Sequence, residues 1–150
     1  MKIALAADHA GYSLKVKVLA DLQAAGHEVT DLGTFSTAPC DYPDFAELGC
    51  EAVRSGTAER AVLVCGSGVG VTVAANKFPG IRAGLCHDHY SAHQGVEHDD
   101  MNVLCLGARI IGEEPAREIV TAFLAARYTG EERHARRLSK VLAIERRFLK

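Results

Sequence analysis

The feature that most constrains the fold is a regular alternation of short apolar runs with longer stretches of helical periodicity. The strongest run is Ala61-Val62-Leu63-Val64-Cys65, an unbroken apolar segment typical of a parallel strand buried on both faces. Five such runs are strand candidates: residues 3–7, 27–32, 61–65, 81–86 and 103–106.

Helical segments lie between these runs and after the last of them. The spacing predicts helices over residues 12–25, 43–54, about 70–76, 89–97, 115–127 (with Pro115 as the first helical residue) and 132–148. Parallel neighbouring strands need right-handed crossover connections, which these helices supply. We therefore expect a single α/β domain over residues 1–150, with a doubly wound, five-stranded parallel sheet, helices on both faces and a C-terminal helix.

Charge and hydropathy exclude several classes of partner. The chain has 17 basic and 19 acidic residues, a balance without the basic surface that nucleic-acid binding requires. No apolar run approaches the roughly 18 residues that predict a membrane span. The first apolar run meets Asp8, too soon for a signal peptide, and the five cysteines form no C-x-x-C pair. We expect a cytoplasmic protein without disulfides and without nucleic-acid or membrane partners.

The loops that follow the strands are the expected location of the functional site, because open α/β sheets bind ligands at the carboxyl ends of their strands. The loop Gly66-Ser67-Gly68-Val69-Gly70 follows the strongest strand. Three glycines allow a tight turn whose N–H groups converge on an anion, a phosphate or a reaction oxyanion, at a helix start. The alternative is a tight turn without a ligand. The loop lacks the Gly-Lys-Ser/Thr of a nucleotide P-loop, and a dinucleotide fingerprint would follow the first strand instead.

Candidate acid–base groups flank this loop. Cys65 ends the strand where the loop would stabilise negative charge on the sulfur, although simple packing is the alternative. Asp8 and His9 end the first strand and are suited to moving hydroxyl protons; Asp8 is equally suited to capping the next helix. His98 is a candidate acid because imidazole titrates near neutrality.

Two further patterns allow alternative interpretations. His89 and His93 have the one-turn spacing of metal ligands and so admit a metal-dependent hydrolase, but the Glu that follows the first His in metalloproteases is absent. We expect no metal and no cofactor. Arg109, after the fifth strand, and the tail arginines Arg133 and Arg137 are suited to holding a phosphate. For the tail, the alternative is a solvated helix with paired charges.

Several short motifs together resemble one family, ribose-5-phosphate isomerase type B, in a group that also contains galactose-6-phosphate and allose-6-phosphate isomerases. The resemblance runs in order from about residue 2 to residue 137. Its motifs are Asp8-His9-Ala10-Gly11, Asp41-Tyr42-Pro43, residues 65–70, Ala75-Asn76-Lys77, Gly80-Ile81-Arg82-Ala83 and Asn102-Val103-Leu104.

The resemblance implies a Rossmann-like homodimer, or a tetramer of paired dimers, with active sites at the subunit interface and a sugar phosphate as substrate. It implies that Cys65 is the base that moves a proton between C2 and C1 in converting ribose 5-phosphate to ribulose 5-phosphate. By the same resemblance, His98 opens the sugar ring, the loop Gly66–Gly70 stabilises the enediolate, and the remaining positions bind substrate: Asp8, His9, Asp99, Arg109, Arg133 and Arg137.

Asp99 departs from the pattern, because the bacterial enzymes usually have Asn at this position. A carboxylate here favours an alternative substrate, such as allose 6-phosphate or a four-carbon or rarer sugar phosphate. A non-catalytic module that binds a phosphate ligand or a nucleotide is the alternative from another class; it explains the glycine loop but leaves Cys65, Asp8 and His98 without a role.

Overall fold

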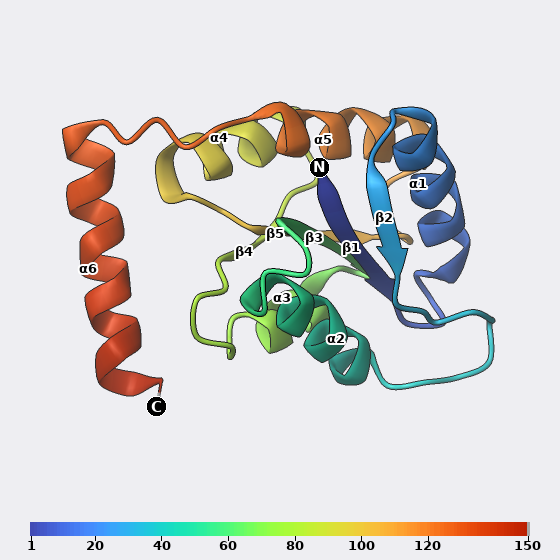
Figure 1. Cartoon of the computed structure of the whole chain (residues 1–150). Coiled ribbons are helices and arrows are strands. Elements are labelled where there is room, and N and C mark those ends of the chain that lie inside the picture. The colour runs from blue at the N-terminus through green and yellow to red at the C-terminus, as the bar shows by residue number, and fades with distance from the viewer. Residues whose placement is uncertain (150) are drawn as a thin grey trace.

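A five-stranded sheet in which every neighbouring pair is parallel forms the centre of the protein, as seen in a computed structural model that describes residues 1–149 (Figure 1). Its spatial order is β2-β1-β3-β5-β4. The α/β class and the parallel sheet predicted from the sequence are confirmed. The strands are β1 (Lys2–Ala7), β2 (Glu28–Asp31), β3 (Arg60–Cys65), β4 (Ala83–Leu85) and β5 (Val103–Gly107).

Helices cover both faces of the sheet, as predicted (Figure 1). One face carries α1 (Tyr12–Ala24), α4 (His89–Asp99) and α5 (Glu113–Ala125), and the other carries α2 (Tyr42–Arg54) and α3 (Val69–Ala75). Because both faces are covered, every second position of a central strand enters a different apolar layer. In β3, Val62 and Val64 join the first layer, and Ala61, Leu63 and Cys65 join the second.

The strand order places its topological switch point, where doubly wound sheets have their ligand crevice, between the carboxyl ends of β1 and β3. From β1 the chain first adds β2 on one side and then crosses to add β3 on the other, so the connections diverge at this point. Ala7 pairs with Val64, and the next N–H, that of Asp8, donates to the Val64 carbonyl at 3.2 Å. Asp8 and Cys65 therefore begin adjacent loops, at the place where doubly wound sheets bind ligands.

A buried ion pair fixes the loop after β2. Lys15 of α1 is 0% exposed, and its Nζ lies 2.5 Å from Oδ1 of Asp31, the last residue of β2. The same oxygen accepts the Gly33 N–H at 3.0 Å. The loop that leads from β2 to α2 thus starts from a rigid, charge-paired anchor.

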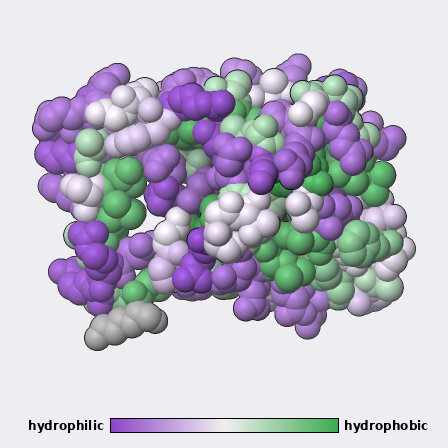
Figure 2. Space-filling model, in the orientation of Figure 1, coloured by the Kyte–Doolittle hydropathy of each residue, from purple (hydrophilic) through white to green (hydrophobic). Residues whose placement is uncertain are grey.

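Helix α6 (Glu132–Phe148) projects beside the sheet and meets α4 near its own start (Figure 1). A groove of about 640 Å³ separates it from β4 and α4. Val141, Ile144 and Phe148 are apolar and more than half exposed, and Figure 2 shows green, apolar residues among the purple, polar ones along this helix. An amphipathic helix with an exposed apolar stripe is typical of a surface that another chain covers.

The element boundaries lie within one or two residues of those predicted, and two of the differences have a clear structural reason. β4 begins at Ala83 rather than at residue 81, because the N–H groups of Ile81 and Arg82 donate to Phe78 and to the side chain of Asn102 instead of to a strand. α5 begins at Glu113, so Pro115 is its third residue. The first turn of a helix tolerates proline because its N–H groups have no partner within the helix. No helix within residues 1–149 has both the length and the apolar character required to span a bilayer.

Candidate active site

Cys65 lies at the crevice, with its sulfur turned toward the glycine loop. The residue is 4% exposed, and Sγ accepts the backbone N–H of Gly68 at 3.1 Å. A donor in this position stabilises negative charge on the sulfur, as a thiolate base requires. The side chain also touches the apolar layer under α2 and α3, so packing and a polar contact coexist at this residue.

The N–H of Gly68 is held in place by an unusual backbone conformation. Gly68 has φ +79° and is the N-cap of α3. A methyl group at this position would lie 2.9 Å from the Leu106 carbonyl carbon and 3.1 Å from the Gly107 nitrogen, so the loop packs directly on the backbone of β5. The neighbouring N–H of Val69 donates to the Ser67 hydroxyl at 3.2 Å. Two amides of the loop are therefore already engaged, one of them with the sulfur.

The other buried cysteines are in a different environment. Burial raises the pKa of Cys50 and of Cys105 to about 12, and that of Cys86 to about 11. Among the residues of the described chain, Cys65 is the one buried cysteine whose sulfur accepts a backbone N–H. All five cysteines are free thiols.

Asp8 and His9 lie across the crevice from this loop. Asp8 is 7% exposed, and its Oδ1 accepts the Gly11 N–H at 3.0 Å. Gly11 is the N-cap of α1, so Asp8 closes the turn that precedes the helix instead of capping the helix itself. Nδ1 of His9 accepts the Cys40 N–H at 3.2 Å, which ties this ring to the loop after β2.

Arg109 completes the group at the carboxyl ends of the strands. Its N–H donates to the Gly66 carbonyl at 2.9 Å, and its Nη1 would lie 3.4 Å from a methyl group at Gly66. The exposed guanidinium therefore lies beside the glycine loop. The structure brings together the following predicted residues: Asp8, His9, Cys65, Gly66, Ser67, Gly68, Val69, Gly70 and Arg109.

Two further residues at this edge were not singled out from the sequence as site residues. The Tyr42 ring packs on the glycine loop, 3.0 Å from where a methyl group at Gly70 would lie. Nε2 of His87, after β4, accepts the Gly107 N–H at 2.9 Å. The motif Asp41-Tyr42-Pro43 and the position of His87 directly after a strand were the signals that pointed to them.

His98 and Asp99 lie at the other end of the sheet within the same chain. Helix α4 starts beside the carboxyl ends of the strands and runs back toward the start of β5, and His98 is near its end. Val103 at that start pairs with Ala61, which is about 13 Å along β3 from Cys65. One chain therefore does not bring His98 to the sulfur of Cys65.

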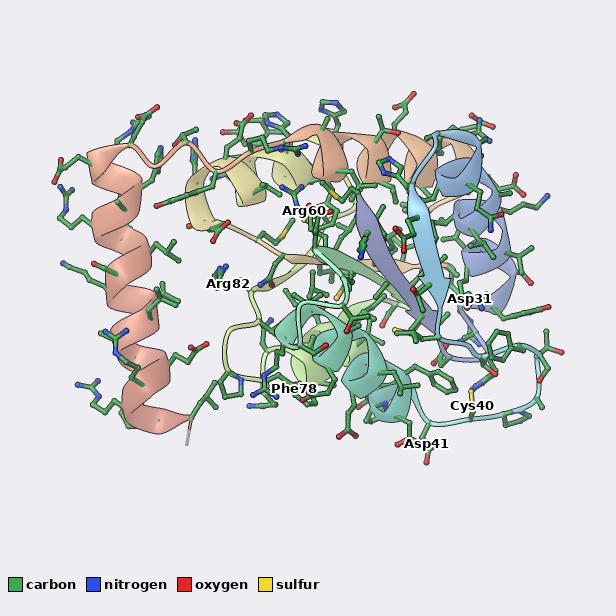
Figure 3. All side chains as sticks on the ribbon, viewed as in Figure 1. Asp31, Cys40, Asp41, Arg60, Phe78 and Arg82 are labelled. Carbon is green, nitrogen blue, oxygen red and sulfur yellow. The ribbon has the colours of Figure 1, made fainter. Side chains whose placement is uncertain are left out.

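The tail arginines also lie away from the crevice. Arg133 and Arg137 are exposed on α6, and Arg133 Nε lies 3.1 Å from Glu131 Oε2. In Figure 3, Cys40 and Asp41 mark the carboxyl side of the sheet at the right, whereas α6 is at the far left. A single chain holds the predicted site residues in two separate groups.

The histidines that suggested a metal site form a surface cluster. The rings of His89 and His93 meet edge to face at 5.4 Å, and His93 Nδ1 lies 3.2 Å from Glu97 Oε2. Within residues 1–149, no three side chains of the metal-ligating types gather closely enough to hold an ion.

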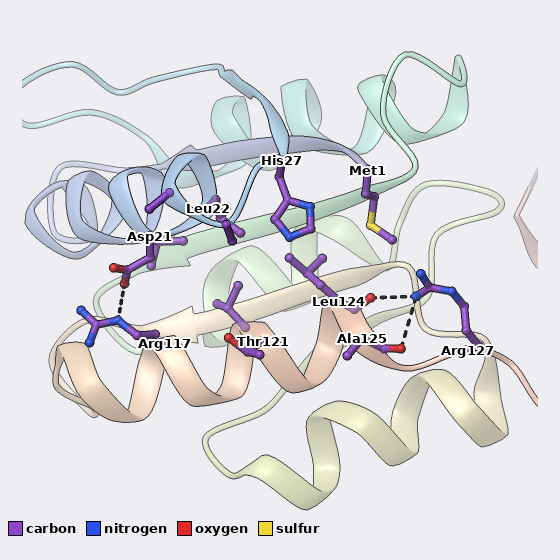
Figure 4. A pocket seen from close by; sticks show the side chains of 13 residues that line it. Met1, Asp21, Leu22, His27, Arg117, Thr121, Leu124, Ala125 and Arg127 are labelled. Atoms are coloured by element: carbon purple, nitrogen blue, oxygen red, sulfur yellow. Dashed lines mark hydrogen bonds and ion pairs between the residues drawn. The ribbon is translucent and has the colours of Figure 1, made fainter.

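A second groove, of about 660 Å³, lies between α1 and α5 at the amino ends of β1 and β2 (Figure 4). It contains His27 and the Asp21–Arg117 ion pair, with a nitrogen–oxygen distance of 3.0 Å. Arg127 at its far end donates to carbonyls of α5. No predicted site residue lines this groove.

Comparisons with known proteins agree on one family. Residues 3–141 match the family model described as Ribose/Galactose Isomerase. The chain is 46% identical over 146 residues to ribose-5-phosphate isomerase B of Escherichia coli, covering 97% of each chain. It is 41% identical over 131 residues to the D-erythrulose-4-phosphate isomerase of Pectobacterium atrosepticum, covering 87% of this chain and 86% of the relative. A solved structure of ribose-5-phosphate isomerase B from Clostridium thermocellum superposes with a TM-score of 0.96 at 44% identity, covering 99% of each chain.

Proposed function

Because the chain belongs to the Ribose/Galactose Isomerase family and is an isomerase, we propose that it interconverts ribose 5-phosphate and ribulose 5-phosphate with Cys65 as the base. The observation that carries this proposal is the 3.1 Å hydrogen bond from Gly68 N–H to Cys65 Sγ. It supports a thiolate at the crevice, beside the amides of the glycine loop and the carboxylate of Asp8.

The proton transfer runs through an enediolate. The Cys65 thiolate removes the C2 proton of the open-chain aldose, and the electron pair moves through C1 onto the carbonyl oxygen. The loop Gly66–Gly70 stabilises this oxyanion; one donor so placed is worth about 2.7–4 kcal/mol. The thiol then returns the proton to C1 as C2 becomes the carbonyl, and the O2 proton ends on O1. The ketose has the same atoms as the aldose, and the Cys65 thiolate is regenerated.

Ring opening must come first, because ribose 5-phosphate is mostly a closed furanose. In this step His98 gives a proton to the ring oxygen as the bond from that oxygen to C1 breaks. The C1 hydroxyl loses its proton to the Asp8–His9 pair and becomes the aldehyde. Asp99 binds a sugar hydroxyl, and Arg109, Arg133 and Arg137 bind the phosphate by charge-assisted hydrogen bonds.

This division of roles requires a second chain. His98 and Asp99 lie at the opposite end of the sheet from Cys65, so a complete site needs His98, Asp99, Arg133 and Arg137 of a partner subunit. The exposed apolar residues of α6 and the 640 Å³ groove beside it support such an interface. We therefore propose a homodimer with two sites at the interface, able to pair further into a tetramer, acting in the cytoplasm in the pentose phosphate pathway.

The test is the rate of ketose formation from ribose 5-phosphate by Cys65→Ala. We expect this variant to fold and to lose at least about 10²-fold in kcat, the low end for a general base. The matched control is Cys50→Ala, which removes a buried thiol of α2 that makes no hydrogen bond to the glycine loop. A Cys65→Ala enzyme with wild-type kcat would remove Cys65 from the mechanism.

A second candidate substrate is a four-carbon sugar phosphate. Asp99 stands where Asn is usual, and a relative named as a D-erythrulose-4-phosphate isomerase is 41% identical. The comparison of kcat/KM for ribose 5-phosphate, allose 6-phosphate and erythrose 4-phosphate decides between substrates. If the four-carbon substrate is the true one, erythrose 4-phosphate gives the highest kcat/KM, and Asp99→Asn shifts the preference toward ribose 5-phosphate.

A further inference from the structure

The ring of His98 is stacked on a second histidine to which nothing above assigns a role. His134 belongs to the first turn of α6, and its ring lies parallel to that of His98, with centroids 3.8 Å apart and 19° between the planes. It is the one buried residue among those of α6, all of which the structure describes, and is 2% exposed. This stack lies at the contact between α6 and α4.

The ring of His134 has a buried nitrogen without a hydrogen-bond partner among the described residues. This nitrogen is Nε2, and the Glu131 carboxylate is 3.9 Å away from it. Burial lowers the pKa of His134, and the nearby charges of His98, Arg133 and Arg137 lower it further, whereas Glu131 acts in the opposite direction. The surroundings of His134 therefore disfavour its charged form.

Of the two ring nitrogens of His98, one is free to contact a ligand. Its Nδ1 is 2.8 Å from the side-chain amide of Gln94, one helical turn earlier. Gln94 thus fixes one edge of the ring and His134 covers one face, so Nε2 is the atom left to meet a ligand. A ring held on an edge and a face has little freedom to rotate.

We propose that His134 is a positioning residue that, through the face of its ring, holds His98 with Nε2 directed at the ring oxygen of the sugar. This inference rests on the proposed role of His98 as the acid that opens the ring. An aromatic ring stacks on the His98 imidazole without the repulsion that a second positive charge would add. His134 itself exchanges no proton with the substrate.

The experiment compares His134→Ala with His134→Phe, which keeps an aromatic face and has no titrating group. His93→Ala is the matched control, because His93 is on the same helix as His98 but belongs to the surface cluster. We expect His134→Ala to lower kcat on ribose 5-phosphate about 10-fold with KM little changed, the loss corresponding to one aromatic stack. His134→Phe recovers kcat to within about 3-fold of wild type, and His93→Ala retains wild-type kcat.

A second measurement separates ring opening from the proton transfer at carbon. Ribulose 5-phosphate cannot close into a furanose because its O5 carries the phosphate, so exchange of its C1 proton with deuterium oxide needs the thiolate but no ring opening. We expect His134→Ala to exchange this proton at the wild-type rate, measured by proton NMR. Size-exclusion chromatography establishes that all variants keep the wild-type oligomeric state.

Three results would overturn the inference: wild-type kcat in His134→Ala, equal losses in the Ala and Phe variants, or a parallel loss of C1 exchange, which indicates general damage. The failure of the proposed function is distinguishable from these. If wild type does not isomerise ribose 5-phosphate, or if His98→Ala keeps full kcat, the role of His98 itself is refuted.

Discussion

Replacing Gly68 with alanine tests the contact between the glycine loop and the sulfur of Cys65. The left-handed conformation of Gly68, φ +79°, costs a residue with a Cβ about 1–2 kcal/mol. The new methyl group would also lie 2.4 Å from Leu85 Cδ1, 2.9 Å from the Leu106 carbonyl carbon and 3.1 Å from the Gly107 nitrogen. The leucine end can move, but the backbone of β5 cannot, which adds about 1–3 kcal/mol.

The expected loss in the free energy of unfolding is therefore about 2–5 kcal/mol, measured by urea denaturation followed by circular dichroism. To relieve the clash, the start of α3 must move away from β5, which withdraws the Gly68 N–H from the sulfur. A hydrogen bond to a charged group is worth about 1.5–3 kcal/mol, so losing this one destabilises the thiolate and lowers kcat by about 10–10²-fold. The rate of ketose formation from ribose 5-phosphate measures this second effect on the folded variant.

Gly26→Ala is the matched control. Gly26 has φ +83° but no atom within 4 Å of the position of an added methyl group, so only the backbone cost of about 1–2 kcal/mol applies. We expect its kcat to stay at the wild-type value. Equal destabilisation of the two variants, or wild-type kcat in Gly68→Ala, would refute the close approach and its link to the thiolate.

Three further predictions concern stability and assembly. Lys15→Met and Asp31→Asn should each lower the free energy of unfolding, measured by urea denaturation, by about 3 kcal/mol, because each leaves one member of the 2.5 Å pair unpaired. The double variant should lose about 1–3 kcal/mol less than the sum of the two single losses, and strict additivity would contradict the pairing. The free energy of unfolding should fall as pH rises above 9, by about 1.4 kcal/mol per thiol at pH 10, because the pKa of Cys50, Cys86 and Cys105 rises from the ordinary 9.0 in the unfolded chain to about 11–12 on folding. Cys50→Ala should show a smaller fall, and an equal fall would argue against the raised pKa of Cys50. Mixing and refolding equal amounts of Cys65→Ala and His98→Ala chains should restore about a quarter of wild-type activity, since half of the dimers are mixed and each has one complete site; no recovery would place both groups within one chain.

The strands were predictable because burial on both faces leaves an unbroken apolar run in the sequence. This signal placed β3 at residues 61–65, one residue short of its observed start at Arg60. It overextended β4, because the apolar character of Ile81 does not reveal that its N–H donates to a turn. Periodicity registers burial, but not which neighbour accepts a hydrogen bond.

The candidate site was predictable at the carboxyl ends of the strands and less so elsewhere. The position of Cys65 at a strand end follows from the sequence, whereas the direction of its sulfur depends on the backbone conformation of Gly68. His134 was not singled out, because a histidine in a highly charged helix is expected to be exposed. It is buried by a residue of α4 that is distant in sequence. Contacts between distant segments depend on packing that no local pattern encodes.

Side chains alternate between the two faces of the sheet along β3, so the number of residues between Ala61 and Cys65 determines the face on which the sulfur lies. The thiol shares its side of the sheet with Ala61 and Leu63, under α2 and α3. Inserting a single residue into this stretch would send the sulfur to the opposite layer, against α1 and α5, and leave the chemistry without its base although every amino acid is still present. Inserting two would restore the side. Whether the count of residues is odd or even thus matters to this enzyme as much as the identity of the cysteine.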